Sequence, residues 1–256
     1  MTRSFRLVQR NAMVFRRIWS GSIFMSFLQP TLYLAAMGLG LGALVDRGGA
    51  VLPGNVSYLA FLAPGLLAGT CMQTASFESS FPVSGKMLWQ RNYEAIFSAP
   101  MRIVDIVVGE LAWVALRLTA VALVFTAVMW LFGAAQTPLV VAAVPAAVLT
   151  GLAFSAPIMA FAATLNKTGN FNGIFRFVIT PLFLFSGVFF PISQLPEPLR
   201  AVAVFTPLFH GVELTRGLAL QTLAWPEAAL HLAYLIGMTA AGTAVAVWAF
   251  ARKLRA

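Results

Sequence analysis

The chain has 256 residues, of which 60% are hydrophobic and only 10% are charged, and its mean hydropathy is +0.85. Soluble domains average about 25% charged residues, so this composition excludes an ordinary soluble globular protein. The formal net charge is +9. The basic residues lie between apolar runs and form no basic domain, which favours a membrane over nucleic acid as the partner.

Residues 1–17 are basic and have no apolar core of their own. Their arginines follow one helical face and their apolar residues another, with Arg3, Arg6, Arg10 and Arg17 against Phe5, Val8, Ala12 and Phe15. This pattern is typical of an interfacial helix on an anionic leaflet, although a simple positive flank of the first span is an alternative. The apolar run at 18–44 is too long for a signal-peptide core, so we expect a retained first span.

Apolar runs of about 20 residues recur along the rest of the chain, and this length crosses the hydrocarbon core. We expect five further spans, at residues 57–78, 103–132, 138–165, 174–190 and 228–250. Lys and Arg gather in alternate connections, and this bias predicts that both termini are cytoplasmic. The predicted fold is all-α, a polytopic membrane protein with six transmembrane helices in a single domain, residues 1–256.

The longest polar interruption, residues 81–110, lies between the second and third predicted spans. Pro82, Gly85 and Pro100 are expected to break the chain and to leave a short helix at 86–98. Its apolar stripe and its charged edge are formed by Trp89, Tyr93, Ile96 and Phe97 on one side and Gln90, Arg91 and Glu94 on the other. This helix is too short and charged to span, and it favours either a cytoplasmic docking surface or a plain connector on lipid.

The segment between the fifth and sixth predicted spans is apolar but interrupted by prolines. These are Pro191, Pro196, Pro198 and Pro207. We expect a pair of short re-entrant or interfacial helices on the outer side, because the segment is too apolar for an ordinary surface loop and too broken to span. His210, Glu213 and Arg216 follow at i, i+3 spacing, and we expect them to bond one another along a helix.

Arg117 lies inside the third predicted span, where a charge is costly and usually faces protein or water. Glu110 lies on the same face, and Glu78 ends the second predicted span, so each is a candidate partner. Two interpretations remain open. Arg117 lines a transport path or an interface, or it is a structural ion pair or a side chain that snorkels toward the membrane surface.

Motifs of enzymes and cofactor sites are missing from the sequence. There is no GxxxxGK phosphate loop, no HExxH and no grouping of Ser, His and Asp, so we expect no catalytic residue, metal site or bound cofactor in this chain. The single Cys71 cannot form an intrachain disulfide. Phe outnumbers Tyr by 22 to 4, which favours a lipid-like or amphiphilic substrate over a free sugar.

The chain resembles the membrane subunit of a type-2 ABC exporter, particularly the nodulation-factor, daunorubicin-resistance and polysaccharide export permeases. The resemblance covers nearly the whole chain. It is most specific in three stretches: FLAPGLLA at 61–68, RNYEAIFSAPMRIVDIVVGE at 91–110 and FSGVFFPISQLPEPLRAVAVFTPLFHGVELTRG at 185–217.

The resemblance implies a coupling helix between spans two and three that docks on a separate ATP-binding subunit. The residues expected to couple to the ATPase are Trp89, Arg91, Tyr93, Glu94 and Phe97. The segment after the fifth span would form outer gate helices that include Pro191, Pro196, Pro207, His210, Glu213 and Arg216. Two permease subunits, expected to be a homodimer, would pair with two ATPase subunits that hold ATP and Mg²⁺.

The expected function is export of a lipid-like, lipid-linked glycan or amphiphilic drug substrate from the cytoplasm or inner leaflet, across the cell inner membrane. The alternative is a self-sufficient secondary carrier or channel. That alternative needs paired intramembrane carboxylates or an inverted repeat, and the sequence displays neither.

Overall fold

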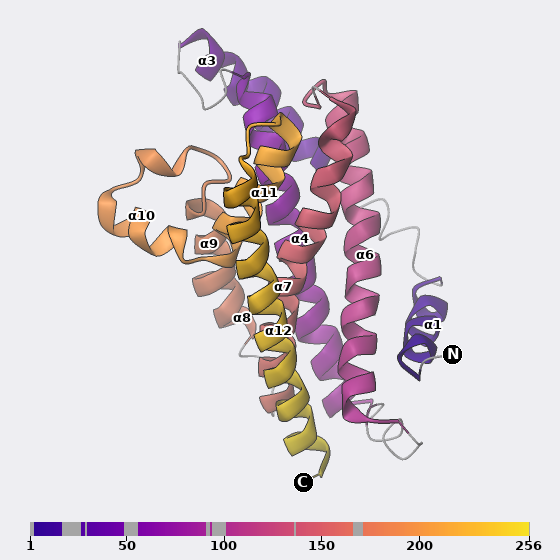
Figure 1. Ribbon diagram of the computed structural model, residues 1–256. Coiled ribbons are helices and arrows are strands. Elements are labelled where there is room, and N and C mark those ends of the chain that lie inside the picture. Colours follow the sequence, from indigo (N-terminus) through magenta and orange to yellow (C-terminus); the bar gives the residue numbers. More distant parts are fainter. Residues whose placement is uncertain are drawn as a thin grey trace.

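The computed structural model describes residues 3–16, 27–28, 30–48, 56–90, 93, 101–135, 137–165 and 171–255. Within these ranges the chain is helical, with no strand. Figure 1 shows an elongated bundle in which α4 (Tyr58–Leu88) and α7 (Ala143–Thr164) lie in contact near the middle. The bundle gives each apolar helix several neighbours to pack against.

Three helical segments among the described residues are both long and apolar enough to cross a membrane. They are α6 (Ile103–Leu131), the segment Pro138–Thr164 made of η2 (Pro138–Ala142) and α7, and α12 (Trp225–Arg255). Their positions agree with the predicted spans at 103–132, 138–165 and 228–250. At the start of α6, Asp105 accepts a hydrogen bond from the Arg102 backbone N–H at 3.1 Å, which satisfies a donor at the helix end.

Helix α4 differs from the prediction at its end. It continues through Pro82 and Gly85 to Leu88 instead of ending near residue 78, so these two residues do not break the chain as expected. Proline is tolerated inside helices that pack among other helices, because neighbouring groups satisfy the freed backbone. The 31 residues of α4 measure about 46 Å at 1.5 Å per residue. Lys86 therefore lies in the same helix, about two turns beyond the predicted end of the span at residue 78.

The N-terminal helix α1 (Arg3–Phe15) packs lengthwise against α6 at the edge of the bundle (Figure 1). Its buried residues are Leu7 and Asn11, whereas Phe5 is exposed. The centre of the contact is therefore beside the predicted apolar stripe, and Phe15 of that stripe also packs against Trp113 of α6. The reason is local: Gly109 leaves room for Leu7, and Asn11 finds a polar partner on α6.

The fifth apolar helix is short. It runs from Phe171 to Phe185 through α8 (Phe171–Ile174), η4 (Phe175–Ile179) and α9 (Thr180–Phe185). The predicted end at residue 190 is wrong, because the chain leaves the helix after Phe185 and turns with Gly187 at φ +82°. Glycine adopts this left-handed conformation without steric cost.

Two short helices follow that turn, as the prolines predicted. Helix α10 (Glu197–Val204) begins after Pro196, and α11 (Pro207–Leu220) has Pro207 at its first position. The Thr206 hydroxyl caps α11 by accepting from the Phe209 backbone N–H at 3.3 Å. The described part of the first predicted span includes η1 (Leu34–Leu41) and α3 (Gly42–Arg47).

Candidate functional site

A buried carboxylate at one end of the bundle collects partners from several parts of the chain. Glu110 on α6 is only 2% exposed, and the Lys86 ammonium at the end of α4 lies 2.7 and 2.8 Å from its two oxygens. The Asn11 amide of α1 donates to Glu110 Oε2 at 3.1 Å. The Tyr93 hydroxyl donates to Oε1 at 3.0 Å. We call these four residues the Glu110 junction.

The chemistry of the Glu110 junction is that of a fully paired buried charge. A carboxylate removed from water is stable only when opposite charge and hydrogen-bond donors replace its hydration. Burial and the adjacent Glu110 carboxylate raise the pKa of Tyr93 well above its usual value. Tyr93 therefore keeps its proton and remains a hydrogen-bond donor to Glu110 throughout the physiological pH range.

Tyr93 also joins the junction to the C-terminal helix. Its ring is fully buried and meets the Phe250 ring of α12 edge to face, with centroids 5.4 Å apart. Met87, Ile106 and Val107 belong to the same apolar cluster. One side chain of the predicted coupling stretch thus contacts the helix that ends the bundle and a charge that holds α1, α4 and α6 together.

This placement differs from the predicted docking surface. Tyr93 was expected on an exposed apolar stripe. Instead it is buried, because its hydroxyl bonds Glu110 and its ring packs against Phe250. Trp89 is 74% exposed and remains open to a partner. Arg91, Glu94 and Phe97 lie outside the described residues, as does most of the predicted helix at 86–98, whose first three residues are the end of α4.

The intramembrane arginine pairs with the second of its two predicted partners. Arg117 Nη2 lies 3.0 Å from Glu78 Oε1, so an ion pair links α6 to α4, while Glu110 pairs with Lys86 instead. The Arg117 guanidinium also lies 4.3 Å from the centroid of the Phe15 ring. The sequence analysis did not identify Lys86 and Asn11 as site residues. A Lys in the last turn of an apolar helix, as Lys86 is in α4, is nevertheless a usable signal of a buried acidic partner.

At the other end of the bundle, the predicted row of bonded side chains on α11 is only partly present. Arg216 Nη1 donates to Glu213 Oε1 at 3.2 Å, as expected from their spacing. His210 bonds another helix instead: its Nδ1 lies 2.8 Å from Nδ1 of His231 on α12, and its ring stacks on Tyr234. A ring that faces α12 cannot at the same time face Glu213 along α11.

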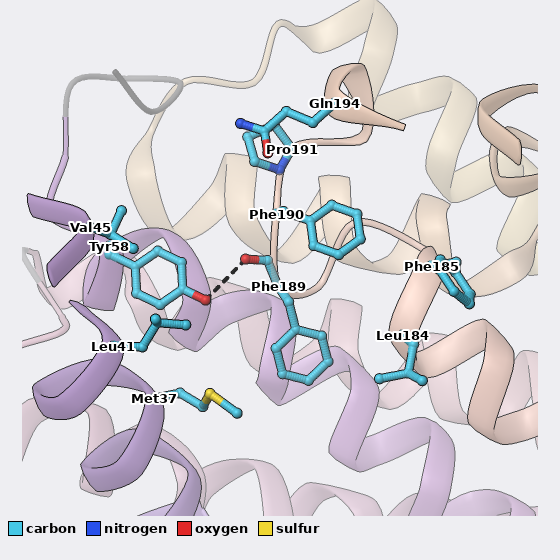
Figure 2. A pocket seen from close by; sticks show the side chains of 10 residues that line it. All are labelled: Met37, Leu41, Val45, Tyr58, Leu184, Phe185, Phe189, Phe190, Pro191 and Gln194. Atoms are coloured by element: carbon cyan, nitrogen blue, oxygen red, sulfur yellow. Dashed lines mark hydrogen bonds between the residues drawn. The ribbon is translucent and has the colours of Figure 1, made fainter. Parts of the chain in front are cut away.

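The predicted gate prolines lie at element boundaries, and one of them lines an apolar cavity. Pro191 precedes η5 (Ile192–Gln194), Pro196 precedes α10, and Pro207 begins α11. Pro191 also lines a cavity of about 620 Å³ between η1, α3, the start of α4 and the end of α9 (Figure 2). The lining is almost entirely apolar: Met37, Leu41, Val45, Tyr58, Leu184, Phe185, Phe189, Phe190, Pro191 and Gln194.

The long apolar helices and the charges paired between them define an integral membrane protein built as a helix bundle. The ABC-2 type transporter family matches residues 3–220 of this chain. Nodulation protein J of Rhizobium leguminosarum bv. trifolii is 35% identical over 212 residues, covering 83% of this chain and 79% of the relative. Nodulation protein J of Rhizobium meliloti strain 1021 is 33% identical with the same coverage. The chain therefore belongs to the ABC-2 transporter family and is a transmembrane permease.

Proposed function

We propose that this permease is the membrane subunit of an ATP-driven exporter and that the Glu110 junction transmits the movement of a separate ATPase into the bundle. The observation that carries this proposal is the position of Tyr93. It belongs to the stretch expected to meet the ATPase, and it reaches Glu110 and Phe250 inside the bundle. A push on that stretch would act on α1, α4, α6 and α12 together.

The proposal includes a topology and an assembly. Six crossings are formed by the first apolar segment, α4, α6, α7, the Phe171–Phe185 helix and α12, with both termini and the junction on the cytoplasmic side of the inner membrane. The charge bias supports this orientation. The chain works as a single domain of 1–256, in a homodimer with two ATPase subunits that hold ATP and Mg²⁺. Ligands for such a cofactor are not expected in the permease itself.

The apolar cavity supports a lipid-like, lipid-linked glycan or amphiphilic drug substrate. Its lining offers aromatic and aliphatic surface, with Gln194 and the Tyr58 hydroxyl as its polar groups. Such a lining holds an alkyl or acyl tail by burial of apolar surface, and a small polar rim orients the head group. The relatives' name associates them with nodulation, and the tail of an amphiphile exported by this chain would lie in this cavity.

Affinity purification of the tagged permease, followed by ATP-driven uptake into inside-out vesicles, tests the proposal. We expect an ATPase to copurify and uptake of a fluorescent acyl-labelled phospholipid to require ATP. Uptake without any copurifying ATPase, driven by an ion gradient, would instead support the secondary carrier. A Trp89→Ala variant should lose ATPase during purification, because Trp89 is the exposed aromatic residue next to the junction and aromatic anchors dominate such interfaces.

A further inference from the structure

Arg216 makes contacts that neither its charge nor its position on α11 predicted. Its side chain is 7% exposed. Nη2 donates to the carbonyl of Gly187 at 2.7 Å and lies 3.4 Å from that of Val188, and Nε donates to the carbonyl of Phe61 at 3.1 Å. The guanidinium also lies 3.8 Å from the centroid of the Phe61 ring. One cation thus joins α11, α4 and the turn after α9.

Gly65 on α4 leaves the space that this guanidinium occupies. A Cβ at Gly65 would lie 2.9 Å from Arg216 Nη2 and 3.0 Å from the Val188 carbonyl oxygen. Real side chains do not approach so closely, so an alanine would displace the arginine or the turn. The absence of a side chain at 65 is therefore a condition for the contact: a Cβ there would meet the end of the Arg216 side chain and also the Val188 backbone.

The turn at 186–190 is held residue by residue. The Ser186 hydroxyl bonds Thr206 Oγ1 at 3.1 Å, Arg216 bonds the next two carbonyls, and the Tyr58 hydroxyl donates to the Phe189 carbonyl at 3.1 Å. Figure 2 shows the Tyr58 bond at the wall of the apolar cavity. The residues that follow in the chain, Phe189, Phe190 and Pro191, line that cavity.

We propose that Arg216 is the positioning residue of the apolar cavity. It does not line the cavity. Its guanidinium bonds join the 186–190 turn to α4, an arrangement that we call the latch, and so fix the wall formed by Phe189, Phe190 and Pro191. A planar guanidinium with five donors can bind several carbonyls at once, whereas an ammonium is a point charge that cannot span them. The role of the cavity as a site for an acyl tail rests on the proposed function, but the latch itself does not.

Cysteine labelling tests the latch without transport. Val188 is fully buried in the turn, so a Val188→Cys probe in a Cys71→Ser background should react slowly with a maleimide. Arg216→Lys keeps the positive charge but loses the planar guanidinium that binds several carbonyls. Gly65→Ala keeps the guanidinium but displaces it. Each should accelerate labelling about tenfold, because local opening governs the reaction of a buried group. Gly237→Ala is the matched control, since a Cβ there meets no atom within 4 Å.

Uptake of a fluorescent acyl-labelled phospholipid into inside-out vesicles, with the copurified ATPase present, tests the positioning role. Arg216→Lys and Gly65→Ala should raise the apparent KM severalfold and leave the maximal rate within about twofold. The reason is that they move the cavity wall but leave the ATPase and the Glu110 junction unchanged. A merely structural arginine would lower the amount of active protein and leave KM unchanged, and that result would overturn the positioning role.

The remaining outcomes are also decisive. Unchanged labelling in folded Arg216→Lys and Gly65→Ala proteins would overturn the latch. If Arg216→Lys does not accumulate in the membrane, Gly65→Ala decides, because it leaves every charge in place. If the unmodified chain does not take up the lipid although labelling responds to both variants, the proposed substrate class fails and the cavity role with it, while the latch stands.

Discussion

The guanidinium of Arg117 lies 3.0 Å from the carboxylate of Glu78, and the pair ties α6 to α4 inside the bundle. Both side chains are largely buried, at 15% and 17% exposure. Removing one member of such a pair leaves the other charge without its partner, which costs more than the pair contributes. The pair therefore provides a direct test of whether Arg117 is structural.

Arg117→Ala should lower the free energy of unfolding by about 2 kcal/mol, less than for a fully buried pair because both side chains keep some exposure. Thermal unfolding of the purified permease in detergent measures this change. Combining Arg117→Ala with Glu78→Gln should recover much of the loss, because no unpaired carboxylate remains. An alanine variant as stable as the original chain would indicate an arginine that merely snorkels.

Tyr93→Phe should separate coupling from folding. The phenylalanine ring keeps its contact with Phe250, but the bond to Glu110 disappears at a cost of about 1–2 kcal/mol. We expect the variant to accumulate normally and to retain the ATPase, while ATP-driven uptake falls. Tyr93→Ala also removes the ring and should cost about 3–5 kcal/mol, which unfolding measurements would detect. Full uptake by the Tyr93→Phe permease would remove the hydroxyl from the coupling mechanism.

Gly109→Ala should displace α1 from α6. The added Cβ would lie 2.8 Å from Leu7 Cδ2 and 3.1 Å from the Ser4 carbonyl oxygen. Overpacking of this kind costs about 1–3 kcal/mol, although alanine favours a helix more than glycine does. Thermal unfolding measures the net effect, and Gly237→Ala serves again as the unobstructed control. A Gly109→Ala chain more stable than the Gly237→Ala chain would show that α1 does not depend on this contact.

The orientation can be tested with single cysteines in the Cys71→Ser background. Trp89 is exposed just after α4, and Arg200 is exposed on α10. We expect a membrane-impermeant maleimide added to intact cells to label Arg200→Cys and to leave Trp89→Cys unlabelled until the membrane is opened, because the charge bias places them on opposite sides. Labelling of Trp89→Cys from outside would contradict this topology and place the end of α4 on the outer side.

The sequence predicted the helices better than it predicted their contacts. The ends of α6 and α7 follow from apolar length, and the start of α6 also follows from a local cap, which neighbouring residues determine. Pro82 was misread because its effect depends on the helices that surround α4, not on the local chain. Tyr93 was misplaced for a similar reason, since Phe250 and Glu110 are distant in sequence and only the folded bundle brings them together.

The role of Arg216 was beyond sequence reasoning for a different reason. Its hydrogen-bond partners besides Glu213 are backbone carbonyls, and every residue carries one, so no residue type identifies them. The usable signals in the sequence are the stretches 61–68 and 185–217, which together with 91–110 carry the resemblance to one family. In the structure Phe61 belongs to the first stretch, Gly187 and Arg216 belong to the second, and Arg216 donates hydrogen bonds to the carbonyls of the other two.

The Glu110 junction draws on parts of the chain that a ribosome makes at very different times. Asn11 leaves first, then Lys86, Tyr93 and Glu110, and the Phe250 ring that seats Tyr93 comes only with α12. Chains emerge at about 5–20 residues per second, so Tyr93 lacks its contact with the Phe250 ring for many seconds after Glu110 has been made. Lys86 is available throughout that interval. Its bond with Glu110 can therefore form during synthesis, before the α12 ring that packs against Tyr93 has been made.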